Sequence, residues 1–261
     1  MGDFVKYEVR GNVAIITLNR PEARNAVNGD LASDMEAVLD RFEEEDGVWV
    51  GVLTANTTGQ NNPVFCAGAD LKAINSGQGA GLSTKRGGFG GFVYRERRKP
   101  VIAAIDGLAT AGGCEIALAS DMIVASTRSA FGLAEVKRNL IAAAGGLFRL
   151  PRAIGKAPAM EIILTGEPLS AQRAYELGLV NKVVEPDDVL AEALAMAEKI
   201  ASAAPLAVQA SRRVVLASAD KDEEELKKMS NSEIAAVMSS EDTKEGLTAF
   251  IEKRAPVWKG R

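Results

Sequence analysis

The sequence predicts an α/β fold with mostly parallel strand pairing, followed by a helical C-terminal third. Short apolar runs rich in β-branched residues, which are typical of buried strands, alternate with helical periodicity through about residue 125. Beyond about residue 155 the apolar spacing becomes helical. The length of 261 residues suits one large domain, or one domain with a small appendage.

The first part of the chain alternates between strand and helix. The run VAIITL at 13–18 is a compact β-rich segment, closed by a turn that contains Pro21. Apolar residues in the stretch 29–45 recur at helical spacing and predict a helix. The run VWVGVL at 48–53 is again typical of a buried strand.

The middle of the chain interrupts this alternation once. The segment 76–91 is rich in glycine and serine without apolar periodicity, which predicts a mobile loop. The basic run 94–99 is interpreted as a solvated helix face. A buried strand at 101–105, a small-residue helix at 111–120 and a strand at 122–125 follow.

The C-terminal third predicts a series of helices. They are expected at 170–178, 189–203, 205–217, from 222 onward, and at 243–254. A helical region placed after an α/β core is typical of a docking or oligomerisation element.

Composition narrows the classes of protein. A net charge of −4 and a pI near 5.2 argue against general nucleic-acid binding, although a local basic patch for a phosphorylated ligand remains compatible with them. No apolar stretch approaches the ~20 residues that span a bilayer. The N-terminal MGDFVKYEVR has no apolar signal core, so the expected location is the cytoplasm, with no membrane partner.

The absence of histidine restricts the chemistry most. With no histidine in the chain, a Ser-His-Asp or Cys-His nucleophilic site, a histidine-ligated metal and a histidine base are excluded. Proton transfer must fall to carboxylates, Lys, Tyr or Cys. Cys66 and Cys114 lack metal-ligand spacing and are expected to be reduced and to serve packing, so no metal site is expected.

Two segments place small residues where a helix begins after a strand, FCAGADL at 65–71 and TAGGCE at 110–115. The first N–H groups of a helix lack partners, so two such ends that meet would bind negative charge. Tight turns and close packing explain these glycines equally well. No phosphate-binding motif of the G-x-G-x-x-G or G-x-x-x-x-G-K-[ST] type occurs in a fitting context.

Glu115 and Glu135 are candidate acid/base residues because each lies in an otherwise apolar stretch. Two neighbouring carboxylates push their proton affinities apart, so that one can act as a base and the other as an acid. Either glutamate alone would also fit a surface or salt-bridged position.

At these residues the chain resembles the enoyl-CoA hydratase/isomerase, or crotonase, family. Residues 102–122 fit the family signature without a gap, through the Asp-Gly turn, the Ala-Gly-Gly triplet at 111–113 and a final Ser-Asp. Further matching segments are 19–26, 67–71, 177–180 and 250–254. The resemblance covers nearly the whole chain. It implies a crotonase-like spiral of ββα units over 1–195 and a C-terminal helical oligomerisation region over 196–261, which forms homotrimers or hexamers.

The resemblance also implies roles for individual residues. The N–H groups of Ala69 and Gly112 would form an oxyanion hole for the thioester oxygen, and Glu115 and Glu135 would hold a water between them. The substrate and its coenzyme A moiety would contact Arg24, Ala26, Val27, Ala67, Gly68, Asp70, Leu71, Gly113, Ala143, Phe250 and Lys253. Phe250 and Lys253 would reach the nucleotide end from a neighbouring subunit, and Asp70 would fix its loop rather than catalyse.

One position departs from the family pattern. Hydratases of this family usually have Pro-Gly-Ala-Gly-Gly where this chain has AAAGG at 142–146. Ala143 therefore occupies the position that helps to hold the water. Its N–H is retained, and its methyl group is expected to crowd the pocket.

The resemblance implies hydration of a 2-enoyl-CoA to a 3-hydroxyacyl-CoA, in fatty-acid or related acyl-CoA metabolism. Two glutamates favour hydration, because isomerases of the family usually keep only the one that matches Glu135. The alternatives are isomerisation of an enoyl-CoA, hydration of a carnitine-type acyl-CoA, or a non-catalytic acyl-CoA-binding or RNA-binding relative. No cofactor is expected beyond the coenzyme A of the substrate.

Overall fold

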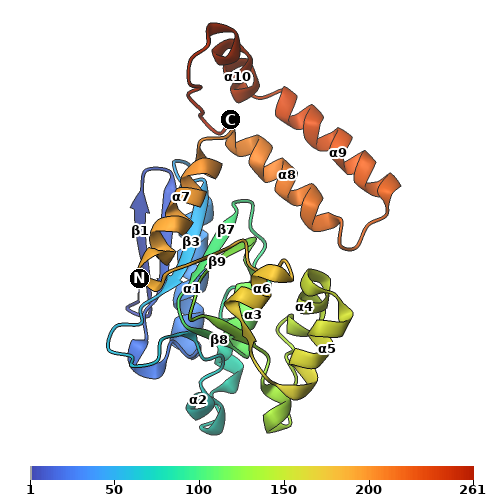
Figure 1. Cartoon of the computed structure of the whole chain (residues 1–261). Coiled ribbons are helices and arrows are strands. Elements are labelled where there is room, and N and C mark those ends of the chain that lie inside the picture. Colours follow the sequence, from blue (N-terminus) through green and yellow to red (C-terminus); the bar gives the residue numbers. More distant parts are fainter. Residues whose placement is uncertain (1) are drawn as a thin grey trace.

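The computed structural model describes residues 2–261, and Figure 1 shows the order of its elements. The strands are β1 (Val5–Arg10), β2 (Val13–Leu18), β3 (Val50–Ala55), β4 (Val64–Cys66), β5 (Ser83–Thr84), β6 (Gly88–Phe89), β7 (Val101–Ile105), β8 (Leu108–Thr110), β9 (Met122–Ser126), β10 (Ala130–Gly132), β11 (Leu169–Ser170) and β12 (Lys182–Val184). The helices are α1 (Gly29–Glu44), α2 (Leu71–Asn75), α3 (Gly112–Ala119), α4 (Gly146–Ile154), α5 (Lys156–Thr165), α6 (Ala171–Glu176), α7 (Val189–Ala201), α8 (Pro205–Ala217), α9 (Glu223–Met238) and α10 (Glu241–Glu252). Short 3-10 helices are η1 (Pro21–Ala23), η2 (Gly79–Leu82), η3 (Glu135–Arg138) and η4 (Pro186–Asp188).

Two sheets organise the core. The larger one has the order β1-β2-β3-β7-β9-β12, with β1 antiparallel to β2 and every later pair parallel. The smaller one has the order β11-β10-β8-β4, in which only β11 is antiparallel to its neighbour. The predicted α/β class with mostly parallel pairing is therefore confirmed. The smaller sheet was missed because its strands have only two or three residues each.

The larger sheet is buried on both faces, as expected for parallel strands. Side chains alternate along each strand, so Val50 and Val52 of β3 face α7, while Leu53 belongs to the cluster that also contains the buried face of α1. The helix α1 begins at Asn28, whose side chain accepts a hydrogen bond from the backbone N–H of Leu31. The sheet thus places α1 and α7 on opposite faces.

Residues 76–99 differ from the sequence-based prediction. Residues 76–91, which were predicted to form a mobile loop, contain η2 and the hairpin β5–β6, and this hairpin packs against α1. The basic run 94–99 is not a helix, and two of its cations are buried. Lys99 donates from Nζ to the backbone carbonyls of Phe42 (2.6 Å) and Glu45 (2.8 Å), where the last turn of α1 leaves acceptors without partners. The solvated-face interpretation was therefore wrong.

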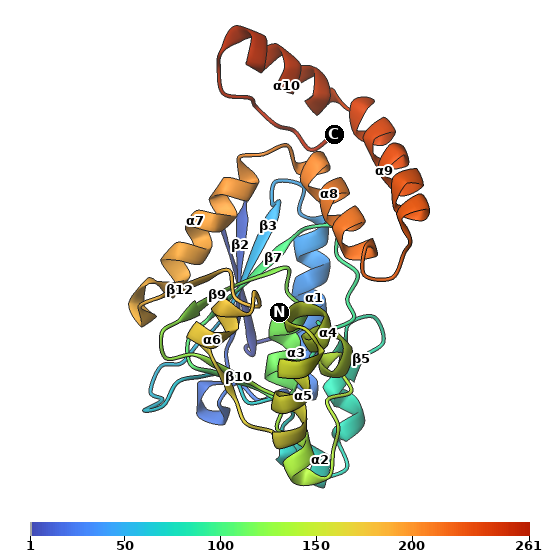
Figure 2. The same cartoon turned by 45° about the vertical axis from the view of Figure 1, so that its right-hand side comes forward.

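The C-terminal helices leave the core as an arm. Figures 1 and 2 show α8 and α9 side by side and α10 beyond them, away from both sheets. The expected boundary between residues 195 and 196 lies inside α7, which packs on the sheet, so the division into two regions stays a prediction. Within residues 2–261, none of the helices combines the length and the apolar character that crossing a bilayer requires.

Candidate active site

A cavity of about 1210 Å³ lies where α2, α3, η3 and the hairpin β5–β6 meet. Ala69, Gly112, Glu115 and Glu135, the four residues to which the sequence assigned catalysis, all line it. Of the eleven predicted substrate contacts, six also line it: Arg24, Ala26, Ala67, Asp70, Leu71 and Ala143. The structure therefore gathers residues from distant parts of the sequence into one concave site.

The loop that carries Ala69 is fixed by a short parallel bridge to Val27. The bridge uses the neighbours of Ala69: the Val27 N–H donates to the Gly68 carbonyl (2.7 Å) and the Asp70 N–H donates to the Val27 carbonyl (2.8 Å). In such a bridge the N–H of Ala69 itself points away from Val27. Gly68, at φ +84, lies so close to α3 that a Cβ there would be 2.9 Å from the Gly112 nitrogen. The two predicted N–H donors thus belong to adjoining loops.

The start of α3 is held in a constrained conformation. Ala111 has φ 51 and ψ −127, a region that side chains rarely adopt, and its N–H donates to the Gly132 carbonyl (2.8 Å). Gly112 is the first residue of the helix, so its N–H has no partner within α3. Gly113 packs directly on β4, because a Cβ there would lie 2.1 Å from the Cys66 carbonyl oxygen. Close packing is therefore a role of Gly113, which does not line the cavity.

Glu115 lies in the first turn of α3 and is only 3% exposed. Its Oε1 accepts a hydrogen bond from the backbone N–H of Gly146 (2.9 Å). Burial, with a smaller contribution from the charge of Glu135, raises the pKa of this carboxyl to about 7, against the lowering effect of the Gly146 N–H. Glu115 can therefore be protonated or ionised near neutral pH, which is what a proton-transfer group requires.

Glu135, the first residue of η3, provides the second carboxyl. Burial raises its pKa, and the charge of Arg138 opposes that shift. Its Oε2 is buried and has no hydrogen-bond partner within residues 2–261. A native protein rarely leaves a buried carboxylate oxygen unpaired unless the group has a task. The cavity thus has two carboxyls of raised pKa, one of them with an unpaired oxygen.

The segment 142–146 differs from what the sequence suggested. The Ala143 N–H, expected to remain available for a water, donates to the Ile141 carbonyl (2.9 Å). The Ala143 carbonyl accepts from the Tyr94 hydroxyl (3.0 Å), and Arg149 donates to the neighbouring Ala144 carbonyl (3.2 Å). Ala143 therefore lines the cavity, but both its N–H and its carbonyl are already hydrogen-bonded within the protein.

Cations gather on the α2 side of the cavity, where Arg20, Arg24 and Lys72 line it. Arg20 pairs with Asp70 (3.2 Å), and Asp70 caps α2 by accepting from the Lys72 N–H (3.0 Å). The expectation that Asp70 fixes its loop is confirmed. Positive charge at this side complements a phosphorylated ligand.

The other predicted residues lie outside the cavity lining. Val27 is buried behind Ala69, and Gly68 lies between the two loops. Phe250, 85% exposed, is on α10, and Lys253 ends that helix at φ 55. Their contact with a neighbouring subunit's substrate stays a prediction. Cys66 and Cys114 are fully buried; burial raises the pKa of Cys66 to about 12 and also raises that of Cys114, so neither supplies a thiolate near neutral pH.

Sequence reasoning missed Phe89, Tyr94, Leu140 and Ile141, which also line the cavity. Phe89 and Tyr94 come from a stretch without periodicity, and no pattern in the sequence marks them. A Cβ on Gly112 would lie 2.3 Å from the Phe89 ring, so this ring rests directly on the start of α3. The two aromatic residues thus line the cavity beside the start of α3 and Ala143, which the Tyr94 hydroxyl contacts.

Comparisons with known proteins agree with the geometry. A family model described as "Enoyl-CoA hydratase/isomerase" matches residues 8–261. The solved structure of enoyl-CoA hydratase from Mycobacterium tuberculosis H37Rv is 44% identical and superposes with a TM-score of 0.93, with both chains fully covered. The (E)-benzylidenesuccinyl-CoA hydratase of Thauera aromatica is 41% identical over 98% of this chain and 99% of that protein. The carnitinyl-CoA dehydratase of Proteus mirabilis is 38% identical over the full length of both.

Proposed function

The chain belongs to the enoyl-CoA hydratase/isomerase family and is a hydro-lyase of the enoyl-CoA hydratase type, and we propose that Glu115 and Glu135 together add water across the 2,3 double bond of its substrate. The observation that supports this assignment is the pair of buried carboxyls with raised pKa values in one cavity, next to the start of α3. Their product is a 3-hydroxyacyl-CoA.

The oxyanion hole stabilises the enolate form of the thioester. The carbonyl oxygen accepts hydrogen bonds from the Ala69 and Gly112 N–H groups, and the dipole of α3 adds to their effect. Negative charge develops on this oxygen when the nucleophile bonds to the β-carbon. Each such donor contributes a few kcal/mol to lowering the barrier.

The two glutamates divide the proton transfers. One carboxylate accepts a proton from water as the water oxygen bonds to the β-carbon, and the other, protonated, gives its proton to the α-carbon. The pair holds one proton before and after the reaction, and the substrate gains one water. Positioned groups of this kind contribute roughly 10²–10⁴-fold in rate.

The coenzyme A moiety lies at the cationic side in this proposal. Arg20, Arg24 and Lys72 meet its phosphates there, and Ala26, Ala67 and Leu71 contact its pantetheine arm. Phe250 and Lys253 of a neighbouring subunit contact the nucleotide end. The reaction uses no cofactor beyond coenzyme A, and its place is in cytoplasmic fatty-acid metabolism such as β-oxidation.

Self-association as a homotrimer, or as a hexamer made of two trimers, is the second part of the proposal. The arm formed by α8–α10 stands clear of the core and exposes large apolar side chains, which include Val215, Ile234, Met238, Leu247 and Ile251. Exposed apolar surface of this kind marks an interaction site. Light scattering that finds a stable monomer at working concentration would contradict it.

The test of hydration follows the loss of enoyl-thioester absorbance with crotonyl-CoA, in parallel with an enoyl-CoA that carries a trimethylammonium group. The second substrate tests the carnitine-type alternative, which the similarity to the Proteus mirabilis carnitinyl-CoA dehydratase suggests. Consumption of crotonyl-CoA with formation of 3-hydroxybutyryl-CoA is the expected result. Protein that binds these thioesters but converts none of them, in either direction, would refute hydration.

The assignment of Glu135 has its own test. Because Glu135 lines the cavity and its buried Oε2 has no partner among residues 2–261, Glu135→Gln is expected to reduce kcat at least 10²-fold and to leave thioester binding nearly unchanged. Calorimetric titration with butyryl-CoA measures the binding. Unchanged turnover in this variant would refute the role of Glu135.

A further inference from the structure

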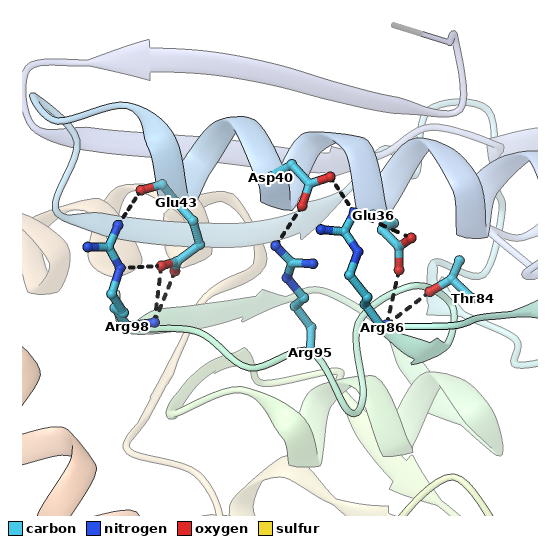
Figure 3. Close-up of polar contacts among 8 residues, drawn as sticks. Glu36, Asp40, Glu43, Thr84, Arg86, Arg95 and Arg98 are labelled. Carbon is cyan, nitrogen blue, oxygen red and sulfur yellow. Dashed lines mark hydrogen bonds and ion pairs between the residues drawn. The ribbon is translucent and has the colours of Figure 1, made fainter.

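A row of carboxylates on the outer face of α1 holds the segment that forms the aromatic wall of the cavity. Glu36 and Asp40 are four residues apart and therefore lie on the same face of the helix. Figure 3 shows arginines from residues 84–98 reaching this face. Arg86 pairs with Asp40 (2.5 Å) and with Glu36 (3.6 Å), and Arg95 pairs with the other oxygen of Asp40 (2.6 Å). We call these four side chains the α1 clamp.

The clamp also holds the backbone of the hairpin. The Gly87 N–H, at the turn between β5 and β6, donates to Glu36 (3.1 Å) and to the hydroxyl of Thr84 (3.0 Å). Behind it, Gly91 packs so closely that a Cβ there would lie 2.3 Å from the Ala32 carbonyl oxygen of α1. The hairpin is therefore fixed to α1 at its turn and again just beyond β6.

The hairpin connects the clamp to two side chains that line the cavity. Phe89 is the last residue of β6, and its ring covers Gly112. The Tyr94 N–H donates to the Gly87 carbonyl (2.9 Å), and the Tyr94 ring covers Gly88, where a Cβ would lie 2.4 Å from it. The Tyr94 hydroxyl in turn reaches the Ala143 carbonyl. One rigid unit thus joins the clamp to both aromatic rings.

The Arg95–Asp40 ion pair of the clamp is better shielded than an ordinary surface pair. The Arg95 side chain is 12% exposed and that of Asp40 is 30% exposed, and one carboxylate is shared by two guanidinium groups. Ion pairs that are partly buried or share a carboxylate in this way contribute measurably to stability, whereas isolated exposed pairs contribute little. The pKa of Asp40 is lowered, chiefly by its hydrogen bond with Arg86, so its charge persists into acidic solution.

We propose that the α1 clamp sets the acyl-length selectivity of the site, by holding Phe89 and Tyr94 as a fixed wall that admits short acyl chains and excludes long ones. This inference rests on the proposed function. With the thioester oxygen at Gly112 and the reacting carbons between the glutamates, carbons beyond them meet the Phe89 ring, which rests on Gly112, and the Tyr94 ring, whose hydroxyl contacts Ala143. A looser hairpin lets the two rings withdraw and lengthens the acyl site.

The experiment compares kcat/KM for crotonyl-CoA with kcat/KM for trans-2-dodecenoyl-CoA in the full-length protein. Wild type is expected to favour the four-carbon substrate. Asp40→Asn keeps the shape of the side chain but removes the charge that both arginines need, and it raises the long-to-short ratio about tenfold, the discrimination that one or two methylene groups provide. Phe89→Leu, which shortens the wall directly, raises the ratio as well.

Two matched variants separate the clamp from general damage to the protein. Arg98→Ala removes an arginine that pairs with Glu43 (3.2 Å) on the same face of α1. Because this pair does not involve the hairpin, the long-to-short ratio is expected to stay at the wild-type value. Arg86→Ala raises the ratio, and Arg86→Lys, which keeps the charge, restores it. Thermal unfolding verifies that each variant is folded; because Arg86 is 54% exposed, its variants remain informative if Asp40→Asn does not fold.

Binding of saturated thioesters supplies a readout that needs no turnover. The ratio of Kd for dodecanoyl-CoA to Kd for butyryl-CoA, from calorimetric titration, is expected to fall in Asp40→Asn and in Phe89→Leu. An unchanged ratio in these variants overturns the inference, as does wild-type protein that accepts both lengths equally. If wild type binds butyryl-CoA selectively but hydrates neither enoyl-CoA, the proposed function fails while the wall is supported.

Discussion

Glu115 is subject to two opposed influences. Its place in the first turn of α3 and the hydrogen bond from Gly146 favour the carboxylate, whereas burial favours the neutral acid. Burial is the larger influence, since the pKa rises to about 7. At neutral pH the folded protein therefore keeps the Glu115 carboxyl partly protonated, whereas a glutamate in water is ionised at that pH. Ionising this buried carboxyl therefore costs folding free energy as the pH rises through its pKa.

The stability of Glu115→Gln should therefore depend on pH. A carboxyl whose pKa is raised from 4.5 unfolded to about 7 folded stabilises the protein fully below pH 4.5, and this contribution is lost as pH rises through 7. The glutamine variant, which cannot ionise, is expected to be more stable than wild type at pH 8 by roughly 2–3 kcal/mol, and to match it near pH 4.5. Urea unfolding at the two pH values measures the difference. A glutamine variant that is less stable than wild type at pH 8 would contradict a buried Glu115 carboxyl with a raised pKa.

Arg149 tunes the same carboxyl from α4. Its charge lowers the pKa of Glu115, and Glu135 acts in the opposite direction. In the proposed mechanism the pair holds one proton, so kcat/KM is expected to be bell-shaped against pH, with apparent pKa values that belong to the pair. Arg149→Met removes the positive charge and should move the alkaline limb to higher pH. Arg149→Lys keeps the charge and serves as the control, and identical limbs in all three proteins would exclude the effect.

The sequence identifies some of these residues and not others, for physical reasons. Glu115 and Glu135 are conspicuous because carboxylates are rare in apolar stretches and no histidine competes with them. Tyr94 and Phe89 have no such mark, since only tertiary contacts bring them to Gly112 and Ala143. The paired N–H of Ala143 depends on the local backbone fold, which the family pattern does not specify.

At the scale of elements, the long runs with clear periodicity were predicted well. The helix expected at 29–45 is α1, and the one expected at 205–217 is α8. The segment 76–99 was mispredicted because its order comes from partners elsewhere in the chain. Three carboxylates of α1 and the carbonyls at its end bind cations of this segment, and a local reading of the sequence does not include those partners.

The contact of α3 with β4 is predicted to be intolerant of even one methyl group. In Gly113→Ala the new Cβ would lie 2.1 Å from a backbone oxygen, so α3 must move. We expect a loss of about 1–3 kcal/mol in unfolding free energy, as for other overpacked sites, and lower kcat, because Gly112 and Glu115 share the helix. Gly47→Ala, where the Cβ meets nothing within 4 Å, is the control and should be neutral. Chemical denaturation and the crotonyl-CoA assay together test this.

At the scale of the whole molecule, the arm is joined to the core by few but specific contacts. Arg212 of α8 pairs with Asp121 (2.8 Å) and also donates to the Arg97 carbonyl. Arg97 is itself buried against Phe92, and this segment leads to Tyr94. The base of the arm thus contacts the segment that forms the cavity wall, while the exposed apolar face of α9 remains available to other subunits.

Loss of the proposed assembly is therefore expected to affect substrate binding more than chemistry. Ile234 and Met238 are four residues apart on α9 and are 55% and 60% exposed, so they form one apolar face. Ile234→Asp should shift the protein toward monomers in light scattering. It should also raise KM for crotonyl-CoA several-fold, because in the proposed assembly Phe250 and Lys253 reach the nucleotide from a neighbouring subunit. Turnover at saturation should fall less, since both glutamates belong to one chain. Lys228→Asp, an exposed position paired only with Glu224 on the same helix, is the matched control. An Ile234→Asp variant that dissociates into monomers without any change in KM would show that assembly through the arm does not contribute to substrate binding.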